Sequence, residues 1–265
     1  MTYPKHRRAP TNPNIRPTEE SLRNLLLEEG LTVKQVAQRL GYGEHGWSNV
    51  YAWCRKYGIE FDLRPNHDIR SQEFSPRQRD VVYGTLMGDG YIRPGKKHDH
   101  LVLGHSSVQA EYLEWKRNEL QPFFPSAMYA NVSGGHSKNP TLYYASVAHH
   151  WLTDLREEWY GTGVKSVTRS ILDKLSPLSV AVWFMDDGSL NRHYGTMFWA
   201  TMGFPYDEQV LIQAWLRERY LIESVIEPRR NGQFGVRVNS TEARKLRSLI
   251  KPHVPGCMRY KVEYP

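Results

Sequence analysis

The stretches V82-Y-G-T-L-M-G-D-G90 and V180-A-V-W-F-M-D-D-G188 share one pattern, and that pattern decides the fold we expect. Each is an apolar run of helical character that ends in Asp-Gly. They lie about one small domain apart, which indicates an internal duplication. Two apolar helices that end at the same level bring their acids, Asp89 and Asp187, to one point. Paired carboxylates at such a seam are oxygen ligands for a divalent metal ion.

The same order of elements follows both stretches. After Asp89 the pattern predicts, in order, strands over 91–94 and 101–104, a helix over 109–120, strands over 127–131 and 141–147, and a helix over 149–159. After Asp187 it predicts a strand over 196–201, a helix over 207–220, a hairpin of 224–229 with 233–238, and a helix over 241–250. The Asn231-Gly232 pair is a strong signal for that hairpin turn. Neither half buries its apolar first helix alone, so we expect the halves to pack together.

Composition narrows the class of protein. The chain has 265 residues, a formal net charge of +7 and a pI of about 9.3. A basic excess of this size favours a polyanionic partner, most simply nucleic acid. The two cysteines, Cys54 and Cys257, fit neither a disulfide framework nor a zinc site, so we expect an intracellular location. We expect no membrane association and no secretion, because no apolar run approaches the length of a span and the N-terminus lacks a signal-peptide core.

The first 75 residues have a different character from the rest. Residues 1–17 are basic and rich in Pro and Asn, which predicts a flexible arm. Residues 18–60 predict three helices, with Thr18 as an N-cap, a capping box from Thr32 to Gln35, and a third helix over 47–57. This unit resembles a helix-turn-helix, although residues 43–46 look inserted in the turn. A plain protein-contact module is the alternative. Residues 61–75 are polar and predict a linker.

The chain from 76 to 265 resembles the LAGLIDADG homing endonucleases in their single-chain, two-motif form. The segments that carry the resemblance are "GTLMGDGYI" and "WFMDDGS", with support from "LGHSSVQAEYLEWK" and "LIKPHVPGCMRYKV". The resemblance implies an α+β fold of tandem αββαββα repeats with pseudo-twofold symmetry, whose sheets form a DNA-binding saddle. The first half would span 76–165 and the second 166–265. The small all-α domain over 18–60 would be an addition to that core.

The resemblance also implies site-specific, metal-dependent cleavage of both strands of double-stranded DNA at a long recognition site, as in intron homing. In the family, the Asp before the last Gly of each motif binds the metal, Mg²⁺ or Mn²⁺. Here those positions are Asp89 and Asp187. Asp186 precedes Asp187 and points about 100° away from it on a helix, so we expect only one of the two to face the seam. We assign that place to Asp187. Gly84, Gly88 and Ala181 are small enough for close helix contact.

A basic residue in each half completes the implied catalytic set. Lys261, in "MRYKV", matches the family's C-terminal lysine position, and Lys165, in "GTGVKSV", is its counterpart in the first half. The spacing from Asp89 to Lys165 nearly equals the spacing from Asp187 to Lys261. His105 and Thr201 lie near the position at which the family places a polar, solvent-orienting residue.

DNA contacts are expected from strands, loops and the third N-terminal helix. Alternation in the hairpin 224–238 puts its polar residues on one face, where Arg and Gln read base edges in the major groove. The candidates on strands are Glu227, Arg229, Gln233, Arg237, Arg93, Tyr129, Asn131 and Tyr143. Those on loops, suited to phosphate, are Lys96, Lys97, Arg192 and Arg230. Those on the third helix are Trp47, Ser48, Asn49, Arg55 and Lys56.

Two other functions share these features. An RNA-splicing maturase, which would bind its own intron RNA, can have the same fold and both acids. A non-catalytic DNA-binding regulator can combine such repeats with a helix-turn-helix. The presence of Asp89, Asp187, Lys165 and Lys261 argues against a regulator, because loss of the acids is the simplest route to inactivity. The leading expectation is an endonuclease that works as a monomer, since one chain carries both motifs.

Overall fold

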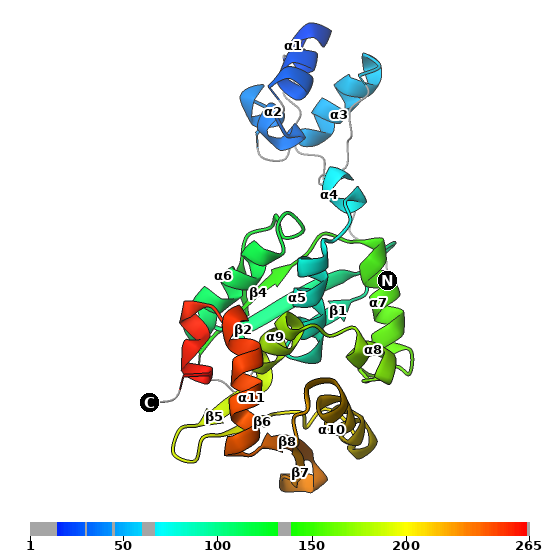
Figure 1. The fold of residues 1–265 in the computed structure, drawn as a ribbon. Helices are drawn as coiled ribbons and strands as arrows, with labels where there is room; N and C mark the ends of the chain where they lie inside the picture. Colours follow the sequence, from blue (N-terminus) through cyan, green and yellow to red (C-terminus); the bar gives the residue numbers. More distant parts are fainter. Residues whose placement is uncertain (1–14, 30, 44–45, 60–66, 132–138, 264–265) are drawn as a thin grey trace. The chain divides into compact units, whose positions relative to one another are not determined.

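A computed structural model describes residues 15–29, 31–43, 46–59, 67–131 and 139–263 (Figure 1). The chain divides into two compact units, residues 1–67 and residues 68–265. Each has its own hydrophobic core. Among the described residues, no helix has both the length and the apolar character that crossing a membrane requires.

The N-terminal unit is helical, as the sequence predicts. It consists of α1 (Glu19–Arg23), a π-helical turn η1 (Asn24–Glu28), α2 (Val33–Arg39) and α3 (Trp47–Lys56). Thr18 caps α1, and Thr32 forms the predicted capping box with Gln35. The expected arm up to residue 14 lies outside the described residues, as do residues 44 and 45 of the expected insertion. The segment expected as a linker contains the short helix α4 (His67–Ser71), and its residues 61–66 are not described.

The second unit contains the predicted duplication of sheets. Strands β1 (Tyr91–Arg93), β2 (His100–Ser106), β3 (Tyr129–Asn131) and β4 (Thr141–Ala145) form an antiparallel sheet in the order β1-β2-β4-β3. Strands β5 (Gly188–Asn191), β6 (Thr196–Trp199), β7 (Val225–Pro228) and β8 (Phe234–Val238) form a second sheet in the corresponding order β5-β6-β8-β7. The tandem α+β fold is therefore confirmed.

Helices connect and cover the two sheets (Figure 1). The first half contains α5 (Pro76–Met87), α6 (Ala110–Glu119) and α7 (His150–Tyr160), and the second contains α9 (Pro177–Asp187), α10 (Tyr206–Tyr220) and α11 (Ser240–Ile250). A short helix, α8 (Arg169–Asp173), links the halves. Between β7 and β8, Asn231 and Gly232 both have positive φ, 59° and 71°, as the predicted Asn-Gly turn requires.

The two motif helices begin with the same local device. Ser75 precedes Pro76 in α5, and Ser176 precedes Pro177 in α9. Each serine accepts the backbone N–H three residues later and forms a capping box, with Gln78 in α5 and Ser179 in α9. Proline suits the first helical position because that N–H has no intrahelical partner. Both helices thus start several residues before the quoted motifs.

Close packing of α5 against α9 forms the seam between the halves, and Gly84 makes it possible. A Cβ built on Gly84 would lie 2.4 Å from the carbonyl oxygen of Ser179 and 2.7 Å from the Cβ of Val182. All of α9 from Leu178 to Met185 is buried. The helices therefore approach through a glycine whose missing side chain leaves room for the opposite backbone.

Gly84→Ala is expected to destabilise the protein by about 1–3 kcal/mol, the usual cost of forcing extra volume into a packed core. The new methyl group must displace a backbone carbonyl of α9, which cannot rotate away. Urea unfolding measures the change. Gly203→Ala is the matched control, because a Cβ there meets no atom within 4 Å. Equal stability of the two variants would contradict the packing argument.

Candidate active site

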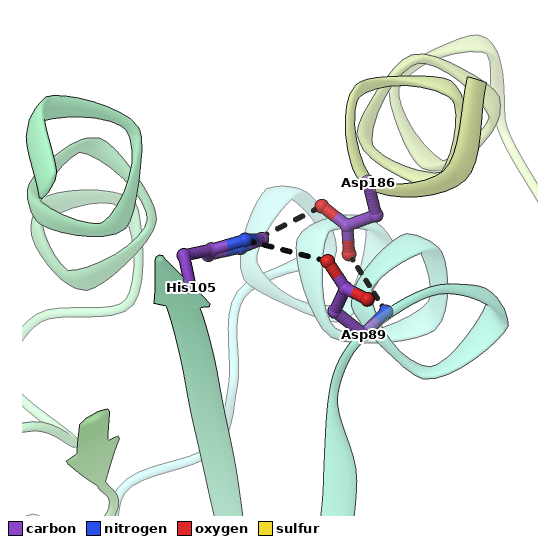
Figure 2. Close-up of side chains that lie close together, drawn as sticks. All are labelled: Asp89, His105 and Asp186. Carbon is purple, nitrogen blue, oxygen red and sulfur yellow. Dashed lines mark hydrogen bonds and ion pairs between the residues drawn. The ribbon is translucent and has the colours of Figure 1, made fainter. Parts of the chain in front are cut away.

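The C-terminal ends of α5 and α9 bring three carboxylates to one point. Asp89 follows α5 by two residues, and Asp186 and Asp187 are the last two residues of α9. Figure 2 shows Asp89 and Asp186 pointing toward each other, with His105 reaching them from the end of β2. Of the two acids expected there, Asp89 lies in this group, and the carboxylate that meets it is that of Asp186 rather than that of Asp187. The Asp89 side chain is 44% exposed, so it remains open to solvent.

The Asp186 side chain faces the seam, although we expected it to point away. Its side chain is fully buried and occupies the space that Gly88 leaves empty, because a Cβ on Gly88 would lie 2.4 Å from the Asp186 Cβ. One carboxylate oxygen of Asp186 accepts the backbone N–H of Asp89 at 3.2 Å. Asp187 is the last residue of α9, and after burial the charges of Asp89 and Asp186 contribute to raising its pKa.

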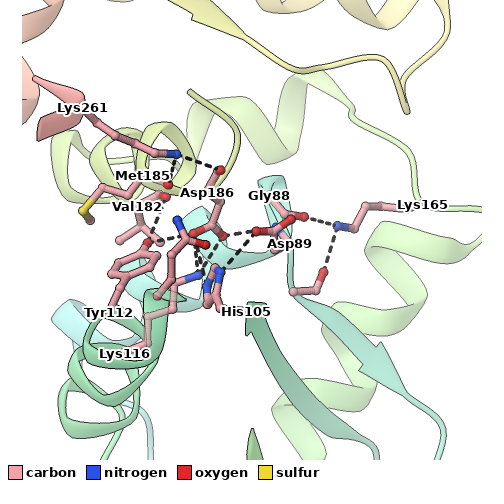
Figure 3. Close-up of polar contacts among 12 residues, drawn as sticks. Gly88, Asp89, His105, Tyr112, Lys116, Lys165, Val182, Met185, Asp186 and Lys261 are labelled. Carbon is pink, nitrogen blue, oxygen red and sulfur yellow. Dashed lines mark hydrogen bonds and ion pairs between the residues drawn. The ribbon is translucent and has the colours of Figure 1, made fainter. Parts of the chain in front are cut away.

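Lys165 and Lys261 lie in matching places at the two helix ends (Figure 3). Lys165 Nζ donates to the carbonyl oxygens of Gly88 and Gly90, at 3.0 and 2.9 Å. Lys261 Nζ donates to the carbonyl oxygens of Met185 and Asp186, at 2.5 and 3.1 Å. Each ammonium group therefore binds the backbone beside the acid of its own half. The matched spacing of the two lysines along the sequence thus corresponds to matching positions in the structure.

Burial changes the proton affinity of these groups. It raises the pKa of Asp187 to about 8, with the charges of Asp89 and Asp186 adding to the effect. Asp89 is partly exposed, and its partial desolvation at the seam, together with the charge of Asp186, raises its pKa. Burial lowers the pKa of Lys165 to about 8, against the opposing charge of Asp187, and it lowers the pKa of Lys261. Burial thus disfavours the charged form of the acids and of the lysines alike, as is common at functional sites.

His105 is the third member of a cluster that has the donors for a cation. One atom each from Asp89, His105 and Asp186 lie within 4.8 Å of one another. The His105 ring nitrogens are 3.4 Å from Asp89 Oδ2 and 3.8 Å from Asp186 Oδ1. Neither nitrogen has a hydrogen-bond partner among the described residues, although the side chain is 1% exposed. Burial, and then the charge of Lys116, lower the His105 pKa to about 3.

His105 should make the protein acid-sensitive. Its folded pKa of about 3 lies below the ordinary 6.5, so the contribution of the neutral ring to stability is complete above pH 6.5 and is lost as pH falls toward 3. His105→Gln removes this dependence. The check is the difference in unfolding free energy between the unchanged protein and the variant from pH 7 to pH 4, without metal. A difference that does not change with pH would show that His105 does not titrate as proposed.

The outer faces of the two sheets carry the predicted strand residues. In the first sheet, Arg93 is exposed, and the Tyr129 and Tyr143 rings stack with centroids 5.5 Å apart. Asn131 pairs with Thr141 in the strand ladder. In the second sheet, Glu227 lies 3.3 Å from Arg237 and 3.7 Å from Arg229, and Gln233 is exposed. The strand registers place Arg93, Tyr129 and Tyr143 on one face of the first sheet, and Glu227 and Arg237 on one face of the second.

The other predicted contact residues lie on the surface. Lys96, Lys97 and Arg230 are exposed in loops, and Arg192 donates to the Tyr260 carbonyl oxygen at 3.2 Å. On α3 the exposed positions are Trp47, Ser48, Arg55 and Lys56, with Asn49 partly buried. Lys56 lies 4.6 Å from the ring centroid of Trp53, so it packs on its own helix. Their contacts with DNA stay predictions.

Sequence reasoning missed two residues of the seam, Tyr112 and Lys116, both on α6. They lie with Leu120 at positions i, i+4 and i+8, on the buried face of that helix. A lysine on an apolar stripe is the signal that was available, because a buried ammonium group needs a partner. The partner is Asp186, whose two carboxylate oxygens accept from Lys116 Nζ at 2.7 Å (Figure 3).

Comparison with known proteins identifies the family and the fold. The LAGLIDADG DNA endonuclease family model matches residues 79–246. The solved structure of the homing endonuclease I-WcaI bound to its DNA recognition sequence aligns with a TM-score of 0.68 and 20% identity, over 78% of this chain and 95% of that one. At this identity the likeness shows the fold.

Two curated relatives are similar in sequence over about 70% of this chain. The DNA endonuclease I-ChuI of Chlamydomonas applanata is 26% identical over 210 residues, covering 70% of this chain and 94% of that protein. The RecA protein of Mycobacterium gastri is 29% identical over 205 residues, covering 71% of this chain and 47% of that protein. This chain therefore spans about half the length of the RecA relative.

Proposed function

Because the chain belongs to the LAGLIDADG DNA endonuclease family, we propose that it is a homing endonuclease that cuts both strands of double-stranded DNA at a long, specific site with a divalent metal ion. One observation carries the proposal. The two motif helices end side by side, Asp89 follows one helix by two residues, Asp187 is the last residue of the other, and a lysine binds backbone carbonyl oxygens at each end. Both sets come from one chain, so we propose that it acts as a monomer.

The residues at the seam fit a divalent metal ion. Asp89 and Asp187 are the carboxylates that we propose hold Mg²⁺ or Mn²⁺, which prefer oxygen ligands. The raised pKa of both acids supports this, because burial and the charges of neighbouring acids penalise carboxylate charges that a cation would stabilise. A bound metal ion supplies charge neutralisation at phosphorus, an activated water and help for the leaving 3′ oxygen.

Lys165 and Lys261 supply positive charge from the protein itself. Each is held by two backbone carbonyl oxygens next to an acid, so its ammonium group is fixed before DNA binds. Fixed charges in a partly dehydrated site stabilise negative charge that develops on phosphate oxygens. With its pKa near 8, Lys165 can also exchange a proton near neutral pH. One such group per half suits the cutting of one strand by each half.

The sheets supply sequence recognition in this proposal. The second sheet offers Arg229, Gln233 and Arg237, whose side chains suit base edges in the major groove. The first offers the Tyr129–Tyr143 stack and Arg93. I-WcaI is a DNA-bound protein of the same fold, and I-ChuI is a DNA endonuclease by name, which supports the assignment of DNA as the partner.

Cleavage of a DNA library tests the proposal. The full chain is incubated with a plasmid library of randomised inserts in Mg²⁺ or Mn²⁺, and the broken ends are sequenced. We expect double-strand breaks within one recurrent long sequence and none when EDTA replaces the metal. A protein that binds DNA yet leaves every insert intact in both metals would instead favour a non-catalytic regulator. Cutting without any metal would reject the metal-dependent mechanism.

A further inference from the structure

A buried ion pair crosses the seam between the two halves. Lys116, on α6 of the first half, is 0% exposed, and the Asp186 side chain, on α9 of the second half, is also 0% exposed. Lys116 Nζ lies 2.7 Å from both carboxylate oxygens. An ion pair this deeply buried does not necessarily stabilise the fold, because the cost of desolvating two charges offsets their attraction. Its presence therefore calls for an explanation other than stability.

Asp186 has all its hydrogen bonds within the protein. Besides Lys116, the Tyr112 hydroxyl donates to Asp186 Oδ1 at 2.8 Å, and the Asp89 backbone N–H donates to Oδ2 at 3.2 Å. The Lys116 ammonium group already lies where a cation bound to Asp186 would lie. Of the three acids at the seam, Asp186 is thus neutralised by the chain, while Asp89 and Asp187 are left without a paired lysine side chain at hydrogen-bond distance among the described residues.

This arrangement is not duplicated in the other half. The position of the first motif that corresponds to Asp186 is Gly88, and only a glycine leaves room for the Asp186 side chain. The contact that crosses the seam therefore runs one way among the described residues: Asp186 of the second half accepts from the Asp89 backbone of the first half.

We propose that Lys116, Tyr112 and Asp186 form a strut that fixes the backbone of Asp89, and with it the direction of the Asp89 carboxylate toward a bound metal ion. They are positioning residues and not metal ligands. Lys116 and Tyr112 hold Asp186, and Asp186 holds the Asp89 N–H. The inference rests on the proposed function in one respect: the ion that Asp89 binds is the one used for cleavage.

A matched pair of variants separates positioning from stability. Both carry Lys116→Met and Tyr112→Phe, which remove the charge and hydroxyl but keep the volume. One adds Asp186→Asn, which keeps an oxygen acceptor for the Asp89 N–H. The other adds Asp186→Leu, which has the same branching and no acceptor. We expect both to fold, because apolar or neutral replacement of a whole buried pair is tolerated. The single variant Lys116→Met, which leaves an unpaired buried charge, should lower Tm by roughly 10 °C.

Binding of Mn²⁺ to the free protein is the decisive measurement, because it needs no cleavage. We expect the leucine variant to bind Mn²⁺ about tenfold or more weakly, the usual cost of losing a group that orients a metal ligand. The asparagine variant should lose less affinity, because it keeps the acceptor for the Asp89 N–H but lacks the Lys116 and Tyr112 donors that hold this acceptor in place. Equal Mn²⁺ affinity in the two variants overturns the strut, as does absence of Mn²⁺ binding by the unchanged protein.

Cleavage supplies the second readout. The leucine variant should lose kcat on the identified target while its DNA affinity stays close to that of the asparagine variant. If the unchanged protein binds Mn²⁺ but cuts no DNA, the proposed function fails, and the Mn²⁺ comparison still decides the strut. Should the leucine variant not fold, Asp186→Ala in the same background takes its place, because it also lacks the acceptor and adds no bulk.

Discussion

Replacing Asp187 with asparagine is expected to abolish DNA cleavage, by on the order of a thousandfold or more, while DNA affinity stays nearly unchanged. Asparagine keeps the shape of the side chain at the end of α9 but cannot supply the negative charge that holds a divalent metal ion. Asp89→Asn should have the same effect, because the two acids share one seam. The measurement is single-turnover cleavage of the identified target in Mg²⁺, alongside DNA binding in Ca²⁺.

The same substitution should increase stability in the absence of metal. The folded pKa of Asp187, about 8, lies above the ordinary 3.8, so its contribution to stability is present below pH 3.8 and is lost as pH rises through 8. Asparagine carries no charge, so the metal-free variant should be more stable than the unchanged protein at pH 8. Asp173→Asn, at an exposed position of α8, is the control for both measurements. Normal cleavage by the Asp187 variant would remove it from the catalytic set.

Loss of either Lys165 or Lys261 is expected to slow cleavage by about a hundredfold or more, the usual range for a positioned charge or proton-transfer group. Methionine keeps much of the length of the side chain and removes the ammonium group. Because each lysine binds carbonyl oxygens beside the acid of its own half, the two DNA strands should be affected unequally. The rate of nicking of each strand, measured with end-labelled target, gives the result.

Stability separates a catalytic from a purely structural role for these lysines. Removing Lys165 also leaves the carbonyl oxygens of Gly88 and Gly90 with one donor fewer, so some loss of Tm is expected. Lys251→Met, at an exposed position, is the matched control for loss of one positive charge. Full cleavage rates on both strands in both variants would exclude the lysines, whatever their effect on Tm.

Much of the fold was readable because its signals are local. The Asp-Gly endings, the Asn231-Gly232 turn and the Thr32–Gln35 capping box each depend on residues within one turn of the chain. Alternation in the last hairpin predicted which side chains share a face. The starts of the two motif helices were not predicted, although their signal is equally local: a serine N-cap followed by proline as the first helical residue. Such patterns act through backbone preference and hydrogen bonds between near neighbours.

Helical geometry alone could not predict which side chains contact one another at the site. Sequence placed Asp89, Asp187 and the two lysines at matching points of a duplication, and the structure puts the lysines beside the two helix ends. The direction of Asp186 depended on an empty space beside Gly88, which belongs to the other half of the chain. The burial of Lys116 depended on its ion pair with Asp186, which lies 70 positions away along the sequence and in the other half.

The sequence by itself thus determined the repeated elements, their order and the residues available for chemistry, because these follow from short-range periodicity and capping. Only the tertiary structure decided which acid is neutralised by the protein and which ones stay open to a cation. The physical reason is that a carboxylate's charge state and hydrogen bonds depend on whatever side chains packing brings within a few ångströms. For Asp186 those side chains come from the opposite half of a seam that exists only after folding.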